Sequence, residues 1–216
     1  MRVLAYGRHF LLLSFAALIL PLGWLALDTL PAGDPRFWTS FALVGVLHAS
    51  SIVVAVRGGT TAKRAIAFVG FAAALSAVTP FVALLAAPVL ELAVPAVLRV
   101  IPSLRSIGDS TPGDSIRFLL VVLFASAFGS SGYWLLIRTF WLKSLRLGDW
   151  LRTVGLCLTA TFLAFLVPAV LSSINRDIAG PLPSVLWWFA FSVSLYWSED
   201  TEKSSAGEPG MAIEHL

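Results

Sequence analysis

The segment that decides the fold is AAPVLELAVPAVLRVIPSLRSIGDSTPGDS, residues 86–115. It is apolar enough to enter a membrane, yet it contains Glu91, Arg99 and prolines at seven-residue intervals. Three placements are open: a transmembrane span, a re-entrant element that lines a cavity, or a helix on the membrane surface. The placement matters because a span here would move every later loop to the other side of the membrane.

The chain as a whole has the composition of an integral membrane protein. Of its 216 residues, 58% are hydrophobic and only 12% are charged, whereas soluble domains have about 25% charged residues. Apolar runs close to the ~20 residues that cross the hydrocarbon layer recur along the sequence. Because lipid cannot hydrogen-bond to the backbone, and the alternating pattern of a barrel strand is absent, we expect an all-α polytopic membrane helical bundle.

Six segments are predicted to be transmembrane helices, and together they would form a single domain over residues 1–198. The N-terminal apolar run is too long for a cleavable signal peptide, so we interpret it as the first span. The tail over residues 199–216 is rich in acidic and small residues, and we expect it to be disordered and cytoplasmic. The predicted spans are 9–28, 37–56, 64–87, 116–138, 150–172 and 183–198.

The distribution of basic residues favours six spans over seven. With six spans, ten Lys and Arg residues lie on one side and five on the other; a further span over 86–102 would make the split nine against six. Cytoplasmic loops carry the excess of positive charge, so we predict an inner (plasma) membrane protein with both termini in the cytoplasm. The net charge of +3 then serves orientation, and no nucleic-acid partner is expected. The eight tryptophans fall near predicted span ends, where indole side chains prefer to lie.

A helical wheel favours the surface placement of the proline-containing segment. Glu91, Pro95 and Arg99 fall on one side of the helix, and the Val and Leu side chains occupy the rest. A buried span would have to desolvate Glu91 at a cost of several kcal/mol. We therefore interpret residues 88–107 as an amphipathic interfacial helix in the outer leaflet. The re-entrant placement remains the alternative.

Small residues at four-residue spacing occur in three of the predicted spans. This pattern lets helix backbones approach closely, which matters in lipid because no hydrophobic drive exists there. Such faces pack either within one bundle or against another subunit, and both readings stay open. The candidate helix-packing residues are Gly70, Ala74, Ala125, Gly129, Ser130 and Gly155.

His48 is the one ionisable side chain well inside a predicted span. A polar group at membrane depth is a functional candidate, for proton relay or for ligand contact. The alternative is an imidazole that bonds to a neighbouring backbone carbonyl. Glu91 and Arg99 are the other candidate functional residues, both in the predicted interfacial helix.

The string GSSG, residues 129–132, resembles the G-x-S-G serine motif of the rhomboid intramembrane proteases. In that family the base is a histidine of the sixth span, and residues 183–198 contain no histidine. A serine nucleophile needs a base within hydrogen-bond reach. Metal-ligand clusters and nucleotide-binding motifs are also absent from the sequence. We therefore predict no catalytic residues, no cofactor, no metal and no enzymatic activity.

These features favour a non-catalytic membrane subunit that assembles as a homo-oligomer or with a partner membrane protein. The alternative is a transporter or channel component for a small neutral solute. An intramembrane enzyme is the third class, which the missing catalytic pair disfavours.

Overall fold

The computed structural model describes residues 34–55, 61–100, 112–141, 146–170 and 185–195. Within these ranges every regular element is an α-helix and no strand occurs, as the composition predicts. The predicted first span, 9–28, and the tail, 199–216, lie outside the described residues. The helices are α2 (Asp34–Ala55), α3 (Ala62–Glu91), α4 (Val94–Val100), α5 (Pro112–Phe140), α6 (Leu147–Val170) and a last helix, Val185–Leu195.

Three of these helices are long and apolar enough to cross a membrane. They coincide with the third, fourth and fifth of the predicted spans. Within the described residues, the apolar parts of α2 and of the last helix, Phe41–Val53 and Val185–Leu195, are shorter than a span. The structure therefore confirms an all-helical protein with three candidate spans, whereas it does not confirm the count of six. The three candidate spans are Ala62–Glu91, Ile116–Phe140 and Leu147–Leu166.

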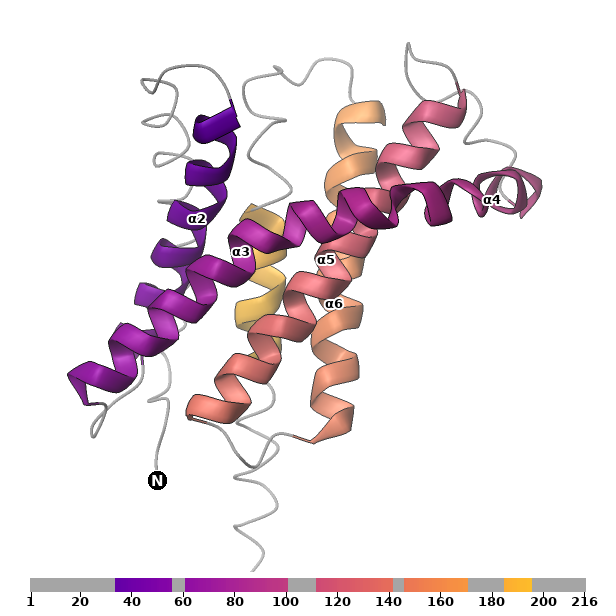
Figure 1. Ribbon diagram of the computed structural model, residues 1–216. Coiled ribbons are helices and arrows are strands. Elements are labelled where there is room, and N and C mark those ends of the chain that lie inside the picture. The colour runs from indigo at the N-terminus through magenta and orange to yellow at the C-terminus, as the bar shows by residue number, and fades with distance from the viewer. Residues whose placement is uncertain (1–33, 56–60, 101–111, 142–145, 171–184, 196–216) are drawn as a thin grey trace, which may run out of the picture.

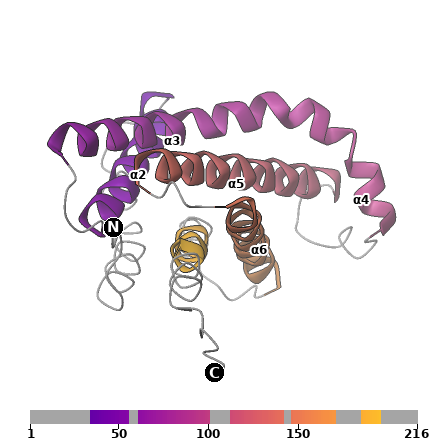
Figure 2. The same ribbon diagram turned by 90° about the horizontal axis from the view of Figure 1, so that it is seen from below.

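Helices that follow one another in the chain pack together, and α5 lies between α3 and α6. α3 packs against both α2 and α5, and α5 packs against α6. Figure 2 shows α5 between α3 on one side and α6 with the last helix on the other. In Figure 1, α3 crosses α5 obliquely instead of running along it. At about 1.5 Å per residue, the 30 residues of α3 extend for about 45 Å, which exceeds the ~30 Å hydrocarbon layer. A tilt accommodates that excess length.

An aromatic cluster forms the core where these helices meet. The Phe68 ring of α3 meets the Trp141 ring edge-on, with 4.1 Å between centroids. The last helix inserts Trp188 and Phe191, both fully buried, although its described part is shorter than a span. Large flat side chains bury much apolar area, so these contacts hold the last helix against α2 and α5. The core also includes Ala49, Ile52, Ala72, Tyr133, Trp134, Ile137, Cys157 and Leu195.

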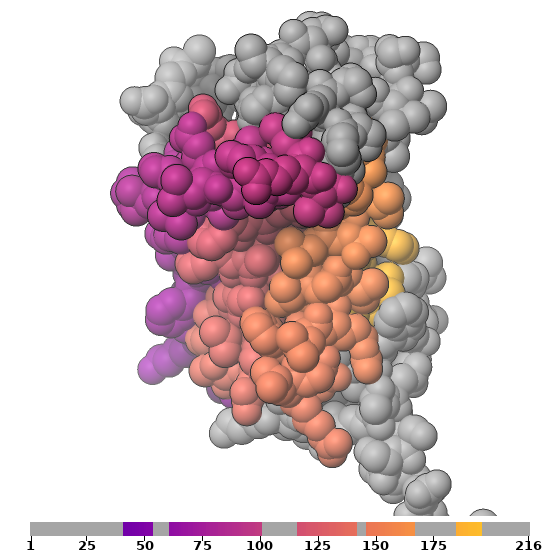
Figure 3. All heavy atoms as spheres, turned by 90° about the vertical axis from the view of Figure 1, so that its right-hand side faces the viewer, coloured from indigo at the N-terminus to yellow at the C-terminus, as the bar shows by residue number. Residues whose placement is uncertain are grey.

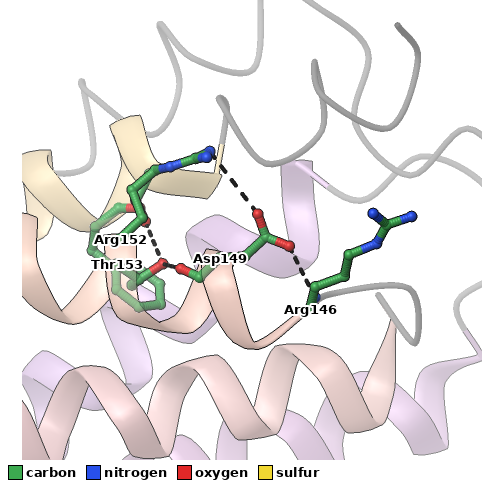
Figure 4. A network of polar contacts seen from close by, with 6 residues as sticks. Arg146, Asp149, Arg152 and Thr153 are labelled. Atoms are coloured by element: carbon green, nitrogen blue, oxygen red, sulfur yellow. Dashed lines mark hydrogen bonds and ion pairs between the residues drawn. The ribbon is translucent and has the colours of Figure 1, made fainter. Parts of the chain in front are cut away.

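Side-chain caps fix where α3 and α6 begin. The Thr61 hydroxyl accepts a hydrogen bond from the Arg64 N–H at 3.3 Å, which satisfies a free donor of the first turn of α3. At the start of α6 the Asp149 carboxylate accepts from the Arg146 N–H at 2.9 Å, and its other oxygen lies 3.9 Å from the Arg152 guanidinium (Figure 4). A carboxylate in the first turn also interacts favourably with the helix dipole.

The segment predicted as one interfacial helix over 88–107 is divided in the structure. α3 continues through Pro88 to Glu91, past its predicted end at residue 87, and α4 begins after a break at residues 92–93. The break follows from Pro95, which has no N–H to donate to the Glu91 carbonyl and whose ring crowds that oxygen. Figure 3 shows α4 and the adjoining end of α3 lying over one end of α5. Residues 101–107 lie outside the described ranges, so an interfacial position for this segment stays a prediction.

Candidate functional site

A cavity of about 210 Å³ lies between the helices at the level of His48. Five helices supply its walls: α2, α3, α5, α6 and the last helix. On α2 and on α5 the lining residues recur every three or four positions, so each helix presents one face to the cavity. The cavity is therefore a property of the bundle and not of a single loop. Its lining residues are Phe41, Val44, His48, Ser76, Thr79, Val122, Ala125, Ser126, Gly129, Tyr133, Thr161 and Trp187.

His48 is held in place by ring stacking. Its side chain is buried, with 4% exposed, and its imidazole stacks on the Trp188 indole with 3.8 Å between centroids and 1° between planes. Among the residues that the structure describes, His48 Nε2 has no hydrogen-bond partner. An unpaired buried polar atom typically costs about 1–3 kcal/mol. The sequence-based alternative, an imidazole bonded to a neighbouring carbonyl, is thus not seen at this nitrogen.

The hydroxyl groups around the cavity are paired with one another or with the backbone. Ser76 of α3 and Tyr133 of α5 share a hydrogen bond of 2.9 Å between their hydroxyl oxygens. Thr79 donates to the Leu75 carbonyl at 2.7 Å. The Ser76–Tyr133 bond ties α3 to α5 at the cavity wall, whereas the Thr79 bond lies within α3.

A second hydroxyl pair joins α5 to α6 at the cavity. Thr161 Oγ1 lies 2.9 Å from Ser126 Oγ and 2.8 Å from the Cys157 carbonyl oxygen. A threonine hydroxyl has a single proton, so Ser126 can donate to Thr161 while Thr161 donates to the carbonyl. Both side chains are buried, and their pairing avoids the cost of unsatisfied hydroxyls in lipid.

Trp187 is the second cavity residue with an unpaired polar atom. Its indole Nε1 is buried and has no hydrogen-bond partner in the described part of the chain. The ring stacks on Phe191 with 5.3 Å between centroids and 9° between planes, which fixes its orientation. Trp134, Trp141 and Trp188 also have unpaired Nε1 atoms within these ranges, but they do not line the cavity.

Glycines determine how closely the helices approach around this site. A Cβ added to Gly45 would lie 2.6 Å from Ser76 Oγ and 2.8 Å from the Ala72 carbonyl oxygen, so α2 and α3 meet here backbone to backbone. A Cβ at Gly132 would lie 2.6 Å from the Leu75 side chain. A Cβ at Gly129, in contrast, would lie 3.7 Å from Thr79 and 3.9 Å from Trp187, which is ordinary contact distance. The cavity wall therefore has room for a Cβ at Gly129 without a clash.

The predicted helix-packing residues fall into two groups in the structure. Ala125 and Gly129 line the cavity, and Ser130 is buried and donates to the Ala127 carbonyl at 3.1 Å. Three others lie on exposed helix faces, and nothing lies within 4 Å of a Cβ added to either glycine among them. Whether those faces meet another subunit stays a prediction. The exposed three are Gly70, Ala74 and Gly155.

Glu91 and Arg99 do not line the cavity. The Glu91 carboxylate, at the end of α3, forms an ion pair and hydrogen bond with the Arg117 guanidinium near the start of α5. This pair joins the ends of two candidate spans. Arg99 is exposed on α4. Of the three sequence-predicted polar candidates, only His48 reaches the cavity.

Sequence reasoning missed several of the residues that complete the site, although a signal was present. Ser126 and Tyr133 recur at helical spacing with the predicted packing residue Gly129, which places all three on one face of α5. Gly45 and Ala49 show the same four-residue spacing of small residues that was recognised in α3, α5 and α6. Trp187 gave no such signal, because a tryptophan near a span end also suits an interfacial position.

Comparison of the chain with protein-family models, curated proteins and solved structures finds no match. The class is therefore defined by the fold and the site alone: an all-helical membrane protein with a cavity between its helices. Within the described ranges, no three His, Cys, Asp or Glu side chains lie close enough together to hold a metal ion.

Proposed function

We propose that this protein is a non-catalytic, multi-pass membrane subunit whose helical bundle binds one small uncharged molecule in the cavity beside His48. Such a molecule would be the solute of a transport component or the ligand of a sensing subunit. Both roles require the same pocket. The proposal combines the two functional classes that the sequence favours.

The cavity beside His48 carries the proposal. His48 is buried, packed flat against Trp188 and placed at the wall of a cavity large enough for a ligand. A polar side chain in the membrane interior is energetically costly, and such a residue commonly marks a functional site.

The arrangement of charged helix ends supports the six-span topology with a cytoplasmic N-terminus and C-terminus. Figure 1 shows the start of α3, the end of α5 and the start of α6 at one end of the bundle. Basic residues belong to each of these helix ends, and an excess of positive charge marks the cytoplasmic side. Residues at these ends are Lys63, Arg64, Arg138, Arg146 and Arg152.

The hydrogen bonds that the serine hydroxyls form support a non-catalytic role. In the rhomboid-like string, Ser130 donates to a backbone carbonyl and Ser131 accepts from the Trp150 indole N–H at 3.0 Å. Ser194 Oγ lies 2.9 Å from Thr153 Oγ1 and joins the last helix to α6. The Ser131 and Ser194 hydroxyls thus join neighbouring helices, which is a common role of hydroxyls in membrane bundles.

The exposed face of α3 is the proposed surface for assembly with a second copy or a partner. Gly70 and Ala74 lie on this face between large exposed side chains, including Ile66 at 71% and Phe71 at 58%. Small residues flanked by larger ones let a second helix approach closely in lipid.

Filling the cavity tests the proposal. The protein is purified in mild detergent, and small molecules released on denaturation are identified by mass spectrometry. Gly129→Leu extends a side chain toward Thr79 and Trp187 and should reduce the bound molecule at least tenfold. Gly155→Leu, on an open face of α6, is the matched control and should retain it. If wild-type protein releases no small molecule, and a screen of uncharged compounds finds none that raises its melting temperature, the proposal is refuted.

A further inference from the structure

We infer that the cavity beside His48 is closed toward the cytoplasm and open toward the opposite side of the membrane, so that it takes a solute from outside. This inference rests on the proposed function, because it treats the basic helix ends as the cytoplasmic side, and it adds where the bound molecule comes from. Helix contacts close the sides of the cavity, the aromatic core closes one end, and fewer buried side chains lie toward the other end.

The directions of the helices fix which end of the cavity is which. α2 and α5 end at the basic side of the bundle, whereas α3 and α6 begin there (Figure 1). The last helix runs antiparallel to α6, because Trp187 lies against Cys157 and Ser194 lies against Thr153. The cavity residues of α3 and α5 lie near the middles of those helices. Each helix therefore has one part on the cytoplasmic side of the cavity and one part on the outer side.

Contacts between neighbouring helices close the sides of the cavity. The close backbone approach at Gly45 joins α2 to α3, and two hydroxyl pairs join α3 to α5 and α5 to α6. The last helix completes the ring of helices: the Cys157 Sγ of α6 lies 3.9 Å from the Trp187 carbonyl oxygen, and Trp188 stacks on His48 of α2. The cavity is nevertheless open and not enclosed. Its entrance therefore lies at one end of the ring.

The aromatic core closes the cytoplasmic end of this ring. The core residues of α2 follow the cavity residue His48 in the chain, and those of α3, which runs the opposite way, precede Ser76. α5, α6 and the last helix show the same order, with Tyr133 at the boundary between cavity and core. The Tyr133 ring meets Trp188 and Phe191 edge-on, with centroids 6.2 and 5.8 Å apart. Because close-packed interiors have few voids larger than a water molecule, this layer blocks passage to the cytoplasm.

The opposite end of the ring has fewer buried side chains. In the described residues, the buried hydrophobic side chains on that side lie outside the core cluster: Ala83 in α3, Ile116 and Leu119 in α5, and Ala164 in α6. The ion pair of Glu91 with Arg117 lies at this end of α3 and α5, and both side chains are about half exposed. Charged side chains near the ends of spans extend to the water interface. The entrance of the cavity therefore faces the outer water layer.

Cysteine accessibility in right-side-out and inverted membrane vesicles tests the inference. Cys157 is the only cysteine of the chain and is buried, and it is replaced by alanine in every variant. Thr79→Cys places a thiol at the cavity wall, and the matched control Val78→Cys places one on the exposed face of α3 at the same depth. The reagent is a cationic, membrane-impermeant methanethiosulfonate, which reacts with the ionised form of a thiol and therefore requires contact with water.

We expect the reagent added to right-side-out vesicles to modify Thr79→Cys at least tenfold faster than Val78→Cys. The same Thr79→Cys protein should react at least tenfold more slowly in inverted vesicles. Ala72→Cys, in the core on the cytoplasmic side of the cavity, should be modified in neither orientation. Labelling after denaturation gives the total thiol and corrects for the amount of each protein.

Three results would overturn the inference: faster modification of Thr79→Cys from the cytoplasmic side, no difference between Thr79→Cys and Val78→Cys, or modification of Ala72→Cys in inverted vesicles. If Gly129→Leu displaces a co-purified molecule while Thr79→Cys does not react from outside, the proposed function stands and this inference fails. If Thr79→Cys reacts as expected but the protein binds no small molecule, the outward entrance stands and the proposed function fails.

Discussion

Replacing Gly45 with Ala should force α2 and α3 apart where their backbones meet. The added Cβ would lie 2.6 Å from Ser76 Oγ and 2.8 Å from the Ala72 carbonyl oxygen. The serine hydroxyl could rotate, but the carbonyl belongs to the backbone of α3 and cannot yield alone. The helices must therefore separate by a few tenths of an ångström or more, which also strains the bond between Ser76 and Tyr133.

The expected cost is that of overpacking a close helix contact, about 1–3 kcal/mol. For a chain of this size, each kcal/mol lowers the melting temperature by about 2–4 °C, so Gly45→Ala should melt about 2–12 °C below wild type. The matched control is Gly129→Ala, whose Cβ would make only ordinary contacts of 3.7 Å and longer. This control should melt at or slightly above wild type, because Ala favours a helix over Gly by up to about 1 kcal/mol.

The measurement is thermal unfolding of the two variants in the same detergent, followed by tryptophan fluorescence. A second readout is ligand occupancy, which Gly45→Ala should lower because its clash displaces the cavity residue Ser76. A Gly45→Ala protein that melts at the wild-type temperature, alongside a destabilised Gly129→Ala, would refute the close approach of α2 and α3 described here.

Three further predictions concern packing, assembly and topology. A double-mutant cycle of Ser126→Ala and Thr161→Val, measured by unfolding, should give a coupling free energy of about 0.6 kcal/mol and at most about 1.7, and zero coupling would contradict the hydrogen bond between them. Gly70→Leu should convert an oligomer to a smaller species in light-scattering mass measurements while Gly148→Leu, also in open space, does not; a monomeric wild type would remove the proposed interface. A reporter fused after residue 198 should be active in the cytoplasm, and activity on the opposite side would refute the six-span topology.

The long apolar helices were predictable because their physical cause is local. A run of apolar residues near 20 long must be helical in lipid, whatever surrounds it. The helices α3, α5 and α6 therefore begin and end close to the predicted limits of these spans. At the end of α3, the structure places the break at residues 92–93 and not before Pro88. A proline can be tolerated within a helix, so its position alone did not locate the break.

The cavity could not be predicted because it depends on which helix faces meet. His48 was recognisable as a polar residue inside a span, but its stacking on Trp188 joins residues far apart in the sequence. The tryptophans illustrate the same limit. Proximity to a predicted span end suits an interfacial position, yet Trp134 and Trp188 are buried in the helix core, where neighbouring helices cover them. Only the tertiary arrangement distinguishes the two environments.

The oblique course of α3 gives the molecule an elongated footprint in the plane of the membrane. The apolar stretch between Arg64 and Glu91 extends for about 39 Å at 1.5 Å per residue. To remain within about 30 Å of hydrocarbon it must lean by roughly 40°, which displaces its two ends sideways by about 25 Å. A neighbouring protein that approaches from the side of α4 would therefore contact the C-terminal end of α3 well before it reached α2.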